Sequence, residues 1–152
     1  KEFKYIMFVG VSMNKNGVAI LEDIVNSKIE DYSIPHVRGN SIRIKHIVVR
    51  HSKKINAWLV YDTIANVQIA RMFCKTGAIA LAKSIADDKQ QTAKIQYLDT
   101  FISKHYNDCI FYKHTMDVTE DSIKYETAQS RFAISIDLTR HAKEELEQII
   151  LS

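Results

Sequence analysis

The most regular hydrophobic pattern in the chain lies at its C-terminal end. Apolar and small residues recur there at alternating spacings of three and four, which places them on one face of an α-helix. They are Tyr125, Ala128, Phe132, Ser135, Thr139, Ala142, Leu146 and Ile149. Asp117 followed by Glu120 resembles a capping box, and no Pro or Gly interrupts the pattern through Ser152. The sequence therefore predicts a long helix at about 119–151.

This helix would be longer than a compact domain of this size requires, since about 30 residues span ~45 Å. We therefore expect part of it to meet another helix or another chain. The candidate contact residues are Tyr125, Ala128, Phe132, Leu146 and Ile149. The alternative is that it packs along helices of its own domain. Ser135 and Thr139 occupy positions where a tight coiled-coil dimer prefers Leu or Ile, which argues against a zipper of two copies.

The centre of the chain has the pattern of a β-hairpin followed by a helix. Two strand-like runs at 55–61 and 67–73 are joined by 62–66, where Asp and Asn favour a turn. Thr76 is then suited to cap a helix with an apolar stripe. This pattern predicts strand, turn, strand and helix over 58–85.

The N-terminal part alternates strand-like and helix-like patterns. A short apolar run at 5–9 predicts a strand, and apolar residues spaced by three and four from Val18 predict a helix that ends before Pro35. The β-branched segment 41–50 predicts one further strand, in which every second residue, His46 included, points into the core.

Between the central unit and the C-terminal helix, the pattern is less regular. Polar residues at 87–91 interrupt it and apolar residues from Ile95 onward restart it, which predicts a kinked or broken pair of helices. Asn107 and Asp108 would close that segment. The following residues, 109–114, are too few and too apolar to assign by periodicity, and we favour an extended conformation over a helix.

Composition places these elements in a globular α+β protein. The 152 residues, 46% of them hydrophobic and 26% charged, suffice for one domain spanning 1–152. One Pro and four Gly are too few for the tight turns of an all-β sandwich. We therefore predict a small antiparallel sheet with packed helices and the long C-terminal helix. No run approaches the ~20 apolar residues of a membrane span, and the first residues lack the order of a secretory signal, so we expect no membrane association.

Charge is unevenly distributed along the chain. From Tyr32 to Tyr61 there is no Asp or Glu, whereas from Asp117 onward eight acidic residues face four basic ones. The basic segment 36–54 contains Arg38, Arg43, Lys45, Arg50, Lys53 and Lys54. These residues could bind an acidic protein surface or a phosphate backbone, with Trp58 nearby to stack on bases. Alternation along a strand, however, would divide them between two faces.

The sequence contains no motif that identifies a reaction. His51 and His114 are each followed by Ser or Thr, which invites comparison with two-histidine phosphoesterases. In those enzymes the hydroxyl residue comes two positions after each His, so that the His and the hydroxyl lie on the same face of a strand. Here the hydroxyl residue is adjacent to the His, which places the two side chains on opposite faces. A small phosphoesterase or nuclease using His46, His51 or His114 therefore ranks third, and Cys109 with a neighbouring His is a weaker nucleophile candidate. We expect no catalytic residue, no metal and no cofactor.

An aromatic residue before Asp, a turn, a short strand and an Ala-rich helix opening with Lys follow one another in the central unit. The residues are Trp58-Leu-Val-Tyr61-Asp62, Ile69-Ala-Arg-Met-Phe73 and Lys75-Thr-Gly-Ala78-Ile-Ala-Leu-Ala-Lys83. This unit resembles one found in small, mostly uncharacterised structural or accessory proteins of tailed bacteriophages. The resemblance implies a role in the virion or its assembly, in the host cytoplasm or the virion, and carries over no site residues.

The leading hypothesis from the sequence is a non-enzymatic structural or assembly subunit, a tailed-phage virion component that acts through protein–protein contacts in an oligomer or larger assembly. The alternative is a nucleic-acid-binding accessory protein that uses the basic segment 36–54.

Overall fold

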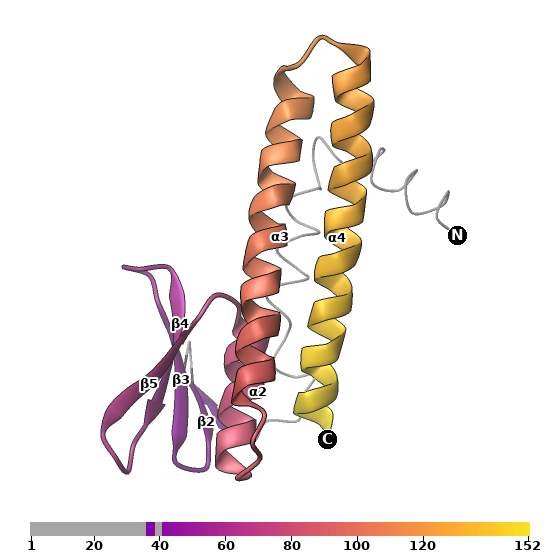
Figure 1. Ribbon diagram of the computed structural model, residues 1–152. Coiled ribbons are helices and arrows are strands. Elements are labelled where there is room, and N and C mark those ends of the chain that lie inside the picture. The colour runs from indigo at the N-terminus through magenta and orange to yellow at the C-terminus, as the bar shows by residue number, and fades with distance from the viewer. Residues whose placement is uncertain (1–35, 39–40) are drawn as a thin grey trace.

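The computed structural model describes residues 36–38 and 41–152. The strand predicted at 5–9 and the helix predicted between Val18 and Pro35 lie outside these residues. Within them the chain forms an antiparallel sheet followed by helices α2, α3 and α4 (Figure 1). The α+β fold class predicted from the sequence is confirmed.

The sheet is a meander, in which each strand pairs antiparallel with the strands next to it in the sequence. The strands are β1 His36–Arg38, β2 Ser41–Ile44, β3 Ile47–Ser52, β4 Ala57–Asp62 and β5 Val67–Met72. Short turns join β2 to β3, β3 to β4 and β4 to β5, so the turns fix the register of neighbouring strands.

The segment predicted as one strand at 41–50 is two strands, β2 and β3, joined by a turn at Lys45 and His46. Lys45 has a φ of 54°, in the left-handed region that residues other than glycine rarely adopt. The chain therefore reverses where no Gly or Asn indicates a turn. His46 is half-buried in this turn rather than on a strand. The His46 carbonyl oxygen accepts two hydrogen bonds from Thr63, one from the backbone N–H at 2.9 Å and one from the side-chain hydroxyl at 2.7 Å.

The hairpin predicted at 55–73 is confirmed as β4 and β5. The carboxylate of Asp62 accepts hydrogen bonds from the backbone N–H groups of Ile64 and Ala65 at 2.9 and 3.0 Å. Asn66 completes the turn with a φ of 57°. Asp and Asn therefore stabilise this turn as the sequence predicts.

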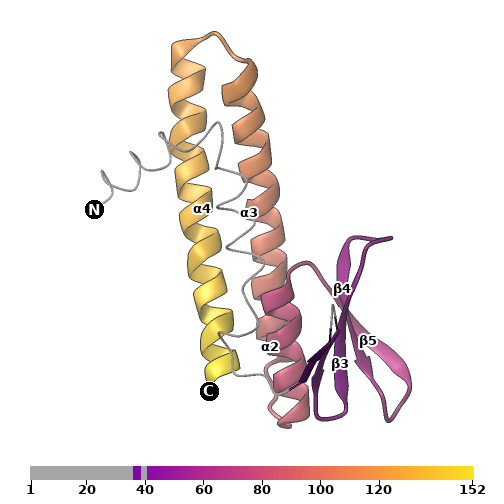
Figure 2. The same cartoon turned by 180° about the vertical axis from the view of Figure 1, so that it is seen from behind.

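Helix α2 (Lys75–Ala86) lies between the sheet and the other two helices (Figures 1 and 2). Its N-cap is Cys74 rather than the predicted Thr76, which is fully buried in the first turn. The residues that follow are buried in succession: Gly77, Ala78, Ile79, Ala80, Leu81 and Ala82. A helix between two layers has no solvated face at its centre, and these small side chains let both layers approach closely.

Helices α3 (Thr92–Val118) and α4 (Ser122–Leu151) form a long antiparallel hairpin that extends beyond the sheet (Figure 1). The break predicted at 87–91 is confirmed as the connection between α2 and α3. Helix α3 continues through Asn107 and Asp108, where the sequence predicts an end, and residues 109–114 are helical rather than extended. No helix in the described part of the chain is both long enough and apolar enough to cross a membrane.

The start of α4 differs from the predicted one. Asp121 is its N-cap, and the Asp121 carboxylate accepts hydrogen bonds from the backbone N–H groups of Ile123 and Lys124 at 2.8 and 3.2 Å. Asp117, the predicted cap, lies in the last turn of α3 and pairs with Lys113 at 2.7 Å. The long C-terminal helix is therefore confirmed with a later start and a different cap.

The hydrophobic stripe of α4 is buried inside the chain, against α3 and α2. Of the predicted partner residues, Ala128, Phe132, Leu146 and Ile149 are buried in the hydrophobic cores and Tyr125 packs half-buried at a core edge. The helix that these residues meet in the structure is therefore one of the same chain. The helix packs along the chain's own helices, as the alternative interpretation holds.

Candidate functional site on the outer face of the sheet

The two faces of the sheet differ in chemistry because α2 covers one of them. On this covered face, Ile42, Val49 and Val60 lie opposite one another on β2, β3 and β4 and belong to the core. The opposite face, termed here the outer face, points away from the three helices (Figures 1 and 2). Side chains alternate between faces along a strand, so the residues between these core positions lie on the outer face.

The strand register places arginines in neighbouring rows of the outer face. One row across the sheet joins Ser41, Arg50, Leu59 and Arg71, and the next joins Arg43, Val48, Tyr61 and Gln68. In β1 the register places Arg38 opposite Ser41, at the end of the first row. Because β2 and β3 form a hairpin, Arg43 and Arg50 fall on the same face, and the division expected for a single strand does not occur.

The arginines of β2, β3 and β5 are open to solvent. Arg43, Arg50 and Arg71 are exposed, and within the described residues none of them lies at ion-pair distance from a carboxylate. The Arg50 guanidinium carbon lies 5.8 Å from the centroid of the Tyr61 ring, in a cation–π contact. The two apolar residues of these rows, Val48 and Leu59, are each only 8% exposed. The outer face is therefore a basic surface over an apolar floor.

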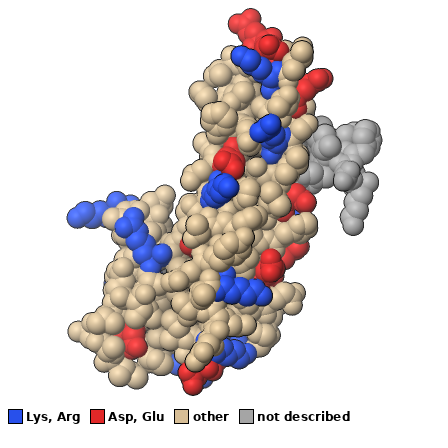
Figure 3. Space-filling view, viewed as in Figure 1, with Lys and Arg blue, Asp and Glu red and all other residues tan. Residues whose placement is uncertain are grey.

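The turn between β3 and β4 extends this basic surface. Lys53 and Lys54 are exposed in the turn, and Asn56 ends it with a φ of 50°. Figure 3 shows basic side chains at this end of the sheet, whereas acidic and basic side chains are interspersed along the helical hairpin. Residues 51–58 are termed the hairpin end below.

The hairpin end also carries the single tryptophan of the chain. Trp58 is half-buried, and the centroid of its ring lies 4.8 Å from that of the His51 ring. The Lys75 Nζ, at the start of α2, lies 5.7 Å from the centroid of the Trp58 ring. An aromatic ring is thus held beside an ammonium group on the side of the sheet that faces α2.

A pocket of about 290 Å³ adjoins the hairpin end. Its polar lining comes from Asn56 in the turn, Arg71 in β5, and Asp99, Thr100 and Ser103 in α3. An arginine of the outer face therefore lies near hydroxyl and amide groups that can donate hydrogen bonds to an anion.

The carboxylate of Asp99 is already occupied at the border of this pocket. Its Oδ2 accepts a hydrogen bond from the Phe73 backbone N–H at 2.8 Å, and its Oδ1 accepts from the backbone N–H and thiol of Cys74 at 3.0 and 3.2 Å. Burial raises the pKa of Asp99 above its ordinary value, against the opposite effect of these hydrogen bonds. The cluster joins the β5–α2 junction to α3, and burial also raises the pKa of the Cys74 thiol, which leaves it a poor nucleophile.

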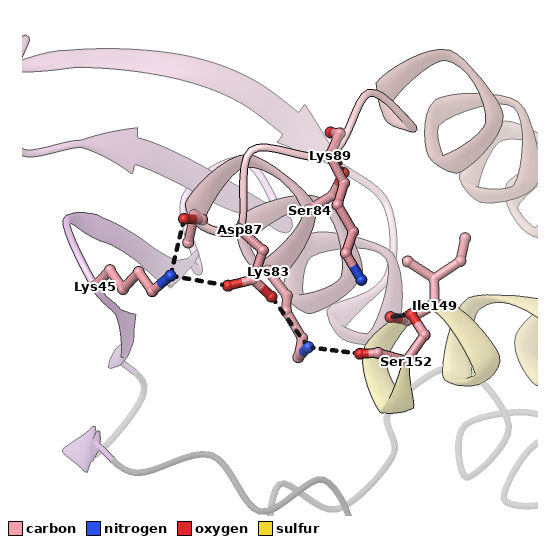
Figure 4. Close-up of polar contacts among 8 residues, drawn as sticks. Lys45, Lys83, Ser84, Asp87, Lys89, Ile149 and Ser152 are labelled. Carbon is pink, nitrogen blue, oxygen red and sulfur yellow. Dashed lines mark hydrogen bonds and ion pairs between the residues drawn. The ribbon is translucent and has the colours of Figure 1, made fainter.

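Lys45, one of the predicted contact residues, binds within the protein (Figure 4). Its Nζ lies 3.1 Å from Oδ1 of Asp87 and 3.3 Å from the Ala86 carbonyl oxygen, at the C-terminal end of α2. Lys83 donates to the other Asp87 oxygen at 3.1 Å and to the Ser152 carbonyl oxygen at 3.3 Å. Hydrogen bonds from Lys45 and Lys83 lower the pKa of Asp87. This cluster ties the β2–β3 turn to α2 and α4, so Lys45 does not belong to the outer face.

The side chains considered for catalysis do not converge. His46 lies in the β2–β3 turn and His51 in β3, whereas His114 lies on the order of 30 Å along α3 from its first residue. Burial, and secondarily the charge of Asp108, raises the pKa of Cys109 to about 12, so its thiol is not ionised at neutral pH. Across residues 36–38 and 41–152, no three His, Cys, Asp or Glu side chains are grouped to hold a metal ion.

The structure therefore keeps part of the predicted basic site and adds to it. Arg43 and Arg50 share the outer face, and Lys53 and Lys54 lie at the hairpin end. Arg71 was missed because the basic segment was taken to end before β5. Side chains alternate between the two faces of a strand, so the burial of Met72 places the preceding Arg71 on the exposed face. This alternation along β5 is the sequence signal that could have identified Arg71.

Comparisons with known proteins add no family to this description. No protein family model, no curated protein and no solved structure matches the chain.

Proposed function

We propose that the chain is a non-enzymatic nucleic-acid-binding accessory protein whose outer face binds the phosphate backbone. One observation carries the proposal: the register gathers Arg43, Arg50 and Arg71 on a face that none of the three helices covers. In the described part of the chain no carboxylate neutralises them. A guanidinium group binds phosphate through two parallel N–H donors, so three on one face favour a polyanion.

The spacing of these charges suits a chain of phosphates. Arg43 and Arg50 occupy diagonal positions on neighbouring strands, where side chains lie about 7–8 Å apart. Arg50 and Arg71 have one strand between them, which separates them by about 10 Å. Lys53 and Lys54 continue the positive surface into the turn. Five basic side chains thus lie on the outer face and in the adjoining turn.

The salt dependence of binding tests this proposal. Labelled oligonucleotides are titrated with the protein at about 50 and 200 mM salt, and fluorescence anisotropy gives the affinity. Contact with about five phosphates of a single strand predicts a slope of about −3.5 in log K against log salt, hence roughly 100-fold weaker binding at the higher concentration.

A matched pair of triple variants locates the site. Replacing Arg43, Arg50 and Arg71 together by Gln is expected to remove most of the affinity. The control variant replaces three exposed basic residues of the helices by Gln and changes the net charge equally: Lys94, Lys124 and Arg131. Equal loss of binding in both variants would contradict a site on the outer face.

A second observation favours the structural or assembly role as the other candidate. In the part of the helical hairpin remote from the sheet, Phe111, Val118 and Ile123 are 64%, 61% and 74% exposed. Exposed apolar side chains in one part of the molecule favour a protein–protein contact there. The resemblance of the central unit to small tailed-phage proteins supplies a setting for this role, a virion or its assembly.

Sedimentation velocity over a range of concentrations separates this candidate from the first. Self-association that is lost in a Phe111→Ser, Val118→Ser double variant would support an assembly role. A chain that stays monomeric throughout, and binds oligonucleotides, supports the accessory protein instead.

A further inference from the structure

We infer that the hairpin end recognises single-stranded nucleic acid by stacking a base on Trp58. This inference rests on the proposed function and names its partner, a single strand rather than a duplex. Arginines on the outer face attract any polyanion, because phosphate contacts carry no information about base pairing. An aromatic ring at the hairpin end, on the side of the sheet that faces α2, adds a contact that only an unpaired base can make.

The indole is held in a fixed position for such a contact. Trp58 packs against the core and is half-buried, so part of its ring remains at the surface. The ring of His51 lies against it at 4.8 Å between centroids, on the neighbouring strand. A base that stacks there meets a side chain whose rotamer is already restricted, which lowers the entropy lost on binding.

Positive charge surrounds this ring. Lys53 and Lys54 precede it in the turn, and the Lys75 Nζ lies 5.7 Å from its centroid. The acidic residue of the same strand, Asp62, lies at the far end of β4, about 14 Å away. Asp99 approaches from α3 with both oxygens accepting hydrogen bonds from the β5–α2 junction. A phosphate beside the indole therefore meets the Lys75 ammonium group, with Lys53 and Lys54 exposed in the adjoining turn.

The bases of a duplex are paired and stacked and offer no free face to the indole, which favours a single strand. Trp58 lies on the side of the sheet that faces α2, and Lys75 of α2 reaches its ring. A single strand can cross this end with its phosphates on Lys53 and Lys54, while a base stacks on the part of the indole that remains at the surface.

Tryptophan fluorescence tests the inference directly, because the chain contains one tryptophan. The full chain is titrated with oligothymidylate of about 12 nucleotides, within the site sizes of single-strand binding surfaces. We expect saturable quenching by the single strand and none by a duplex of equal length that binds the same protein. Equal quenching by both, or by an oligomer without bases, would overturn stacking on Trp58.

A substitution gives a second readout. Trp58→Leu retains an apolar side chain and removes the stacking surface, so single-strand affinity should fall about 5- to 160-fold, the range for the loss of one stacked base. Duplex affinity should stay unchanged, and a Trp58→Phe variant should recover part of the loss. Unchanged single-strand affinity in a folded Trp58→Leu protein would contradict the inference.

Failure of the inference and failure of the proposed function give different results. Salt-dependent oligonucleotide binding without quenching leaves the outer face as a nucleic-acid site and removes Trp58 from it. No oligonucleotide binding at low salt, together with binding of polyglutamate, overturns both and assigns the basic surface to an acidic protein.

Discussion

The covered and outer faces of the sheet come from the same strands and differ in burial and in charge. On the covered face, Ile47, Val49 and Val60 are 0% exposed and form the core with α2. The outer face presents Arg43 and Arg50 to solvent. Outside the hairpin end, alternation along each strand thus separates the residues that stabilise the fold from those available to a partner. A substitution on one face should change stability or binding, and rarely both.

The largest change in stability is expected on the covered face. Ile47→Ala shortens a fully buried side chain and should lower the free energy of unfolding by about 2–5 kcal/mol. Arg43→Ala, which lies on the outer face, should change it by less than about 0.5 kcal/mol. Urea unfolding followed by circular dichroism measures both values. Similar losses in the two variants would remove the distinction between the faces.

A smaller change is expected where the covered face continues into α2. A Cβ on Gly77 would lie 2.7 Å from Oδ1 of Asp99 and 3.3 Å from Sγ of Cys74. Alanine favours a helix over glycine by about 1 kcal/mol, but overpacking a buried contact costs about 1–3 kcal/mol. Because this carboxylate is held by three donors, we expect Gly77→Ala to destabilise the protein by about 1–2 kcal/mol.

A double-mutant cycle checks the cause of that loss. In an Asp99→Ala background the added Cβ meets no carboxylate, so Gly77→Ala should cost less or become neutral. The same cost in both backgrounds would show that the clash with Asp99 is not its origin.

The smallest change is expected at the surface cluster around Asp87, and it should depend on pH. The folded pKa of Asp87 lies below the ordinary value of 3.8 because Lys45 and Lys83 bind the charged form. Its contribution is therefore present above pH 3.8 and is lost as the pH falls through the folded pKa. Lys45→Gln should lower the free energy of unfolding by less than about 1 kcal/mol at neutral pH, since the Lys45 side chain is 63% exposed.

Unfolding at a series of pH values measures this difference. The gap between Lys45→Gln and the unsubstituted protein should close in acid, where Asp87 is protonated in both. A gap that is independent of pH would mean that Lys45 acts through packing rather than through its charge.

The elements that the sequence predicts well are those whose local chemistry and hydrophobic pattern agree. The β4–β5 hairpin has Asp62 and Asn66 at the positions where a turn needs them. The stripe of α4 has a spacing of three and four that only a helix satisfies, and its residues are buried as predicted. The sequence could not say which surface would cover the stripe, because the partner helix α3 contains the segment 109–114 that periodicity left open.

The elements that the sequence misses depend on tertiary contacts. The β2–β3 turn has Lys45 in a left-handed conformation, and the Thr63 hydroxyl and Asp87 carboxylate that hold this region come from distant parts of the chain. The outer face is missed for the same reason. With one strand at 41–50, Arg43 and Arg50 fall on opposite faces, and a turn of two residues between them puts them on one.

The meander has a consequence for the order of folding. From β2 to β5, each strand pairs with the next strand in the sequence across a short turn, so the chain entropy lost in closing each pair is small. Contact between α2 and α4, in contrast, requires the chain to return along the whole of α3. Local contacts form faster than distant ones, so the sheet that carries the outer face should assemble before α4 closes over α2.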